Sequence, residues 1–141
     1  MTGAWELLDQ ETPTGVVRFG TNAWTELNTS SLRAALDILT ADGRIVSLFE
    51  VPCYGSGNTN DPEPDRSDPQ RIAALNQIYT DVSRSMPKVQ IVHWRTLVCP
   101  GGHRVENIAG VHLWLPDDQH LSSAGAVVVW KWWLPQLRAS P

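Results

Sequence analysis

Clusters of basic residues are absent from this chain, which has 11 Lys and Arg against 15 Asp and Glu and a formal net charge of -4. Because nucleic acid attracts proteins through clustered positive charge, we expect no nucleic acid partner. Long hydrophobic runs are also absent. No apolar stretch approaches the roughly 18 residues of a membrane-spanning helix, and residues 1–20 lack the basic and apolar regions of a signal peptide.

Cysteine is scarce as well. Cys53 and Cys99 are too few for a disulfide scaffold and too far apart for a C-x-x-C motif. Each follows an apolar, strand-like run, so the two lie at one sheet edge if those strands are neighbours in a parallel sheet. A disulfide outside the cytoplasm and a pair of reduced thiols both remain open.

The 141 residues, 42% of them hydrophobic, are enough for one domain spanning residues 1–141. Hydrophobic periodicity predicts three helices and two clear strands. The predicted helices cover 27–42, beginning as early as Ala23, then 69–86 and 122–134. The predicted strands cover 44–51 and 89–94, with a further short strand at 111–115. A loop is predicted at 53–68 and a turn at 100–102. This alternation predicts an α/β fold with a parallel sheet covered by helices. Because two strands make a poor core, either residues 16–19 add an edge strand or part of the domain is missing.

One histidine stands in a setting suited to catalysis. His120 follows Asp117 by three residues in a short polar loop before the last predicted helix. An acid at that spacing can accept the Nδ1 proton of the imidazole, which leaves Nε2 free as a general base. The plainer interpretation is that Asp117 and Asp118 favour the helix N-terminus and that His120 is simply solvated.

The other three histidines, His93, His103 and His112, have no acid or cysteine at ligand spacing. We therefore expect no metal and no cofactor.

The segment from Asp117 to Gln136 resembles the last block of the SGNH hydrolase superfamily, in which D-x-x-H precedes a small polar residue, Ala-Gly and an amphipathic helix. Further matches follow the family's order, in Thr2–Glu6, Asp42–Gly43, Val51–Tyr54, Asp68–Asn76 and Leu97–Gly101. Together they are similar to the extracytoplasmic C-terminal SGNH domain of bacterial membrane acyltransferases that O-acylate cell-surface glycans. The resemblance covers nearly the whole chain.

The resemblance implies a flavodoxin-like three-layer sandwich of SGNH type, here lacking its first strands. It assigns Asp117 as the orienting acid and His120 as the general base. It also implies serine acyl-enzyme chemistry on an acylated carbohydrate or small ester, in an extracytoplasmic setting. The family's Gly-Asp-Ser nucleophile and first oxyanion glycine have no match, and Trp5 stands where many members carry an oxyanion Asn.

We therefore expect the chain alone to be inactive, to regain activity with an N-terminal half, and to associate through an open sheet edge. Ser56, between two glycines, does not fit a nucleophile elbow, and Ser122 is better explained as a helix cap. The alternative function is a non-catalytic glycan- or partner-binding module, for which Trp5, Trp24, Trp94 and Trp114 are the candidate stacking residues.

Overall fold

The computed structural model describes residues 10–12, 15–17, 21–53 and 69–139. Their elements follow in the order β1 (Gln10–Thr12), β2 (Gly15–Val17), α1 (Thr21–Thr40), β3 (Val46–Phe49), α2 (Pro69–Arg84), β4 (Val89–Val92), α3 (Arg95–Val98), η2 (Pro100–Gly102), β5 (Asn107–Ile108), β6 (Val111–His112) and α4 (Ser123–Ala139). The chain divides into two compact units, one formed by residues 1–48 and 73–92 and the other by 49–72 and 93–141.

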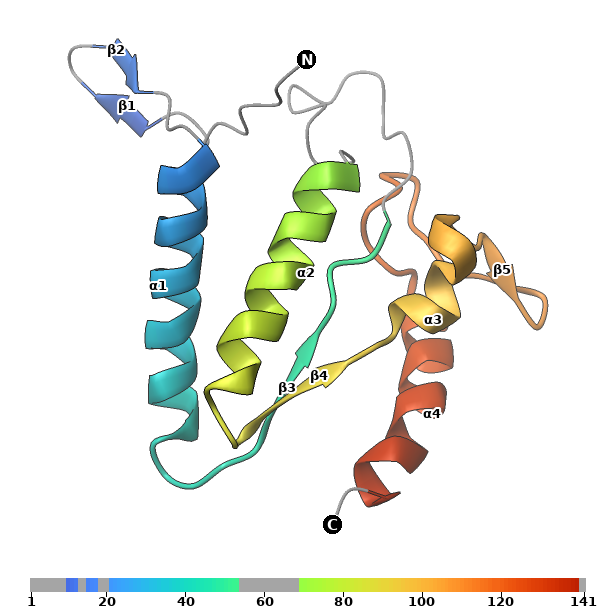
Figure 1. Ribbon diagram of the computed structural model, residues 1–141. Helices are drawn as coiled ribbons and strands as arrows, with labels where there is room; N and C mark the ends of the chain where they lie inside the picture. Colours follow the sequence, from blue (N-terminus) through green and yellow to red (C-terminus); the bar gives the residue numbers. More distant parts are fainter. Residues whose placement is uncertain (1–9, 13–14, 18–20, 54–68, 140–141) are drawn as a thin grey trace. The chain divides into compact units, whose positions relative to one another are not determined.

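The first unit contains helices α1 and α2 and the parallel pair β3–β4 (Figure 1). Its core is apolar because each helix contributes residues at spacings of three and four to one face. The buried members are Trp24, Leu36, Ile78, Val82, Met86 and Val89, with Val46 and Leu48 of β3 packed against them. The predicted α/β class with a parallel sheet is thus confirmed at this coarse level.

One of the two alternatives for completing the parallel sheet was an edge strand from residues 16–19, and this pairing is wrong. Val16 and Val17 belong to β2, which pairs antiparallel with β1 in a separate two-stranded sheet. Within the described residues, the sheet formed by β3 and β4 therefore gains no strand from this segment. Arg18 and Phe19 lie outside the described residues.

The second unit carries two short elements that the sequence did not predict, α3, which follows β4 directly, and β5. Strand β5 pairs antiparallel with β6. The short strand predicted at 111–115 is confirmed as β6, but over Val111 and His112 only. The hairpin turn consists of Ala109 and Gly110, both with positive φ, at 50° and 80°. A two-residue turn of this kind matches the right-handed twist of its strands.

Helix α4 begins as predicted and ends later. The hydroxyl of Ser122 accepts a hydrogen bond from the Gly125 amide at 2.9 Å, as expected of an N-cap. The helix continues beyond Leu134 through Pro135. On this helix Val127 and Trp130 are about half exposed, while Val129 is buried.

The small residue Gly125 is required by a close backbone approach. A Cβ atom at this position would lie 2.1 Å from the main-chain oxygen of Leu113, far inside van der Waals contact. The absence of a side chain therefore lets the first turn of α4 pack directly against the strand segment that precedes the Asp117 loop. None of the described helices is long and apolar enough to span a bilayer.

Candidate functional site

The loop that carries Asp117 and His120 is a tight turn closed by backbone hydrogen bonds. The amide of Leu115 donates to the His120 carbonyl at 2.7 Å, and Trp114 forms an isolated antiparallel bridge with Leu121. Asp118 adopts positive φ, at 60°, as Asp and Asn do more readily than most residues. The chain thus reverses direction over four residues just before α4.

Asp117 and His120 form the predicted hydrogen bond. Asp117 Oδ2 lies 2.7 Å from Nδ1 of the imidazole. Asp117 Oδ1 also accepts hydrogen bonds from the backbone amides of Gln119 and His120, each at 3.0 Å. These three interactions hold the imidazole with Nδ1 toward the carboxylate, so that Nε2 is the nitrogen left for other partners.

The same hydrogen bonds determine the charge of the acid. The amides of His120 and Gln119, and then the His120 side chain, lower the pKa of Asp117 from 3.8 to about 2. Asp117 is therefore a carboxylate at neutral pH. A charged carboxylate is the form that both accepts the Nδ1 proton and stabilises an imidazolium.

The surroundings of His120 are more open than expected. Its side chain is 74% exposed, and the open pocket found in this unit is lined by other residues. That the imidazole faces a substrate cleft stays a prediction. The plainer interpretation, that His120 is solvated and that the acids favour the helix N-terminus, also holds in part. Asp117 accepts hydrogen bonds from amides of its own turn. The N-cap of the helix, however, is Ser122.

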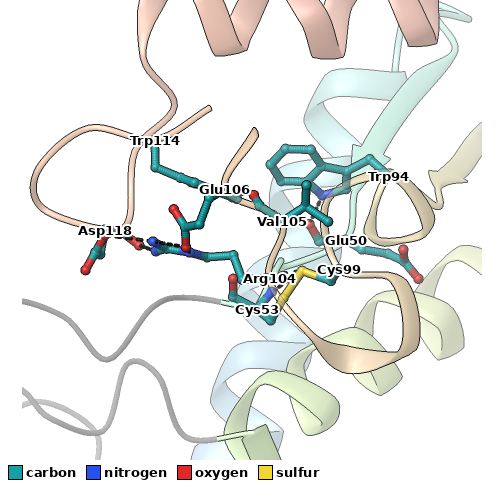
Figure 2. Close-up of a disulfide and its surroundings, with 9 residues drawn as sticks. All are labelled: Glu50, Cys53, Trp94, Cys99, Arg104, Val105, Glu106, Trp114 and Asp118. Atoms are coloured by element: carbon teal, nitrogen blue, oxygen red, sulfur yellow. Dashed lines mark hydrogen bonds and ion pairs between the residues drawn. A yellow bond between two sulfur atoms is a disulfide. The ribbon is translucent and has the colours of Figure 1, made fainter. Parts of the chain in front are cut away.

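Arg104 fixes the loop from outside, a role that the sequence analysis did not predict (Figure 2). Its guanidinium donates to the Asp118 carbonyl oxygen and to Asp118 Oδ1, both at 2.8 Å, and to Glu106 at 2.7 Å. Its carbon Cζ lies 5.1 Å from the ring centroid of Trp114, whose indole nitrogen donates to Val105. The planar, multi-donor guanidinium suits this combination of forked hydrogen bonding and stacking.

Arg104 is also well shielded, with only 11% of its side chain exposed. Burial opposes its charge, but hydrogen bonds and ion pairs with Asp118 and Glu106 outweigh this effect and raise its pKa. Arg104 thus remains a cation that ties the turn to the β5 region. No local signal reveals this contact, because 14 residues separate Arg104 from Asp118.

Cys53 and Cys99 form a disulfide, with their Cα atoms 6.0 Å apart (Figure 2). The predicted proximity is confirmed, and of the two open alternatives the structure has the bridge. Cys53 comes four residues after β3, and Cys99 follows α3. The disulfide therefore joins the segments that continue from the two parallel strands.

The prediction that His93 has no acid partner is wrong, because the fold brings an acid from a distant part of the sequence next to it. Its Nδ1 lies 3.0 Å from Oε1 of Glu50, 43 residues earlier in the chain. Glu50 follows β3 directly and His93 follows β4, so the chemistry-bearing residues come just after parallel strands. That placement was the signal that could have revealed the pair.

Three of the four tryptophans named for a binding surface are not available for it. Trp24, Trp94 and Trp114 are all buried, and the indole nitrogens of Trp94 and Trp114 are occupied by main-chain oxygens of Glu50 and Val105. Their burial leaves Trp5 as the remaining candidate stacking residue, and Trp5 lies outside the described residues.

Some of the predicted positions cannot be placed. Trp5, the rest of the segment from Thr2 to Glu6, and Ser56 lie outside the described residues. Among the described residues, no group of three or more His, Cys, Asp or Glu side chains is arranged to hold a metal ion.

No protein-family model matches the sequence, and no curated protein matches it either.

Proposed function

We propose that the chain is the C-terminal part of an SGNH-type domain with a flavodoxin-like sheet, which transfers or hydrolyses an acyl group, expected to be acetyl, on a carbohydrate. The observation that carries the proposal is the hydrogen bond between Asp117 Oδ2 and His120 Nδ1. The D-x-x-H spacing, the Ser122 cap and the close contact at Gly125 agree with the motif that the resemblance predicts.

In this proposal the pair works on a serine hydroxyl. His120 Nε2 takes the hydroxyl proton while the serine oxygen forms a bond to the acyl carbon, and the carbonyl oxygen becomes an oxyanion. Asp117 stabilises the imidazolium that results. The proton then passes from Nε2 to the departing sugar oxygen, leaving an acyl-enzyme for water or a second hydroxyl to attack.

The serine and its oxyanion donors come, in this proposal, from a strand, Gly-Asp-Ser and helix segment that precedes the blocks matched here. The disulfide supports the extracytoplasmic setting, since such bonds form and persist in oxidising compartments. Ser122 does not act as the nucleophile, because its hydroxyl donates to the His112 carbonyl and accepts from the Gly125 amide.

The test is hydrolysis of p-nitrophenyl acetate by the chain alone and by the chain combined with an N-terminal half carrying Gly-Asp-Ser. We expect background rates for the chain alone and turnover for the combination. His120→Ala should lower that turnover on the order of a thousand-fold or more, while Ser56→Ala should leave it unchanged.

Two outcomes would contradict the proposal. One is turnover by the chain alone that disappears in both Ser56→Ala and His120→Ala, which would make Ser56 the nucleophile. The other is turnover by the combined halves that persists when His120 is replaced.

A further inference from the structure

An open pocket with a volume of about 480 Å³ lies beside Glu50 and His93. Arg95 and Thr96 line it from α3, and Pro100 and Gly101 line it from the following turn. A volume of this size falls within the range that small-molecule sites occupy in proteins. The pocket shares no residue with the Asp117 turn.

Glu50 and His93, two of the polar residues that line the pocket, are each held by further hydrogen bonds. Glu50 Oε1 and His93 Nδ1 lie 3.0 Å apart. The main-chain oxygen of Glu50 accepts a hydrogen bond from the buried Trp94 indole, as Figure 2 shows. Thr96 Oγ1 donates to the His93 carbonyl at 2.7 Å. Both residues are thus positioned before any ligand arrives, which reduces the ordering that binding requires.

Glu50 carries an unmet hydrogen-bonding demand. Only 18% of its side chain is exposed, and no group in the described part of the chain hydrogen-bonds its buried Oε2. Buried carboxylate oxygens are satisfied by donors in nearly all proteins. Oε2 itself has almost no exposed surface, whereas the Oε1–His93 pair is exposed where the pocket lies, so a ligand's donor meets the carboxylate there.

His93 offers a second hydrogen-bond acceptor to a ligand. Because its Nδ1 faces a carboxylate, the proton is held on Nδ1 and the neutral ring presents a lone pair at Nε2. The imidazole is 67% exposed and so accessible. Carboxylate and imidazole nitrogen are both acceptors, whereas the Arg95 guanidinium is only a donor.

The charges of the pocket select among ligand classes. The Glu50 carboxylate disfavours an anion and Arg95 disfavours a cation. A structural or catalytic zinc ion uses at least three protein ligands, and the described residues contain no such cluster. Neutral hydroxyl groups remain, because each one donates and accepts at the same time.

We propose that this pocket binds a neutral polyhydroxylated ligand, a sugar, whose hydroxyl groups donate to the Glu50 carboxylate and His93 Nε2 and accept from Arg95. The site is separate from the Asp117–His120 pair and does not depend on acyl transfer by the chain. It is a site for the ligand's hydroxyl groups and not for an ester.

The experiment is an NMR titration of the isotopically labelled chain with glucose, galactose, mannose and N-acetylglucosamine, each compared with zinc chloride and sodium phosphate. We expect at least one sugar to give saturable shifts of the His93 ring and the Thr96 amide. Absence of saturable shifts with all four sugars, or saturation by zinc or phosphate in their place, would overturn the proposal.

Variants assign the shifts to the pocket. Glu50→Gln should weaken the sugar affinity about tenfold or more, since it removes a charged acceptor, and His93→Ala provides a second test at an exposed side chain. Asp81→Asn is the control, an exposed acid paired with Arg84 on α2, and should bind sugar as the unmodified chain does. If Glu50→Gln and His93→Ala both bind sugar as tightly as the unmodified chain, the proposed site is refuted. Failure of the esterase assay, in contrast, would not affect this proposal.

Discussion

Reduction of the Cys53–Cys99 bond should cost the protein a large part of its stability. The bond joins residues 46 positions apart. In the chain-entropy model, closing a loop of that length removes freedom from the unfolded chain worth about 4 kcal/mol at 25 °C. Small domains have free energies of unfolding of about 5–15 kcal/mol, so this single bond accounts for a substantial fraction.

The measurement is urea unfolding followed by far-UV circular dichroism, with and without a reductant. We expect the unfolding free energy to fall by about 4 kcal/mol on reduction, and the thermal midpoint to fall by about 13 °C. The double variant Cys53→Ala/Cys99→Ala should match the reduced protein and should not respond to reductant.

Two results would refute this reasoning. The first is an unchanged midpoint on reduction of protein whose thiols are shown to have become free. The second is labelling of two thiols in protein unfolded without reductant, which would show that the bridge had not formed.

Three further predictions concern the Asp117 loop and its supports. Gly125→Ala should destabilise the protein by about 1–3 kcal/mol, although alanine is normally the better helix former, because its Cβ meets the Leu113 carbonyl; a more stable variant in urea unfolding would contradict the contact. The pKa of Asp117 is lowered to about 2, so its carboxylate contributes to the free energy of unfolding above pH 3.8, and this contribution is lost as the pH falls toward 2. The stability difference between the unmodified chain and Asp117→Asn should therefore shrink between pH 3.8 and pH 2. A difference that stays constant over that interval would contradict the prediction. Arg104→Met should cost about 2 kcal/mol by breaking the charged hydrogen bonds to Asp118, while the control Arg44→Met, whose ion pair is exposed, should change stability by less than about 0.5 kcal/mol.

The sequence predicted those parts of the fold whose cause is local. Helix α2 follows from its apolar spacing and from Pro69, which suits the first helical position. The β5–β6 hairpin was missed because its turn is Ala109–Gly110, whereas the strong signals for a two-residue turn are Asn-Gly and Asp-Gly. The separate pairing of β1 and β2 depends on which strands meet, and local pattern does not determine that.

The same distinction separates the two acid–histidine pairs. Asp117 and His120 are three residues apart, so their hydrogen bond could be predicted from spacing and turn chemistry alone. Glu50 and His93 are brought together only by the pairing of β3 and β4, 43 residues apart. Arg104 is a similar case, because its partner Asp118 reaches it only through the folding of the hairpin segment between them.

The compactness of the Asp117 turn has a consequence for inheritance. The three hydrogen bonds between Asp117 and the residues that follow it are made within four consecutive residues. A short insertion or exchange of coding sequence could therefore move the aligned pair intact into another protein, whereas the Glu50–His93 pair would have to be transferred together with two strands. Recombination can thus transfer this turn as one short segment. Point mutations could also create it one residue at a time.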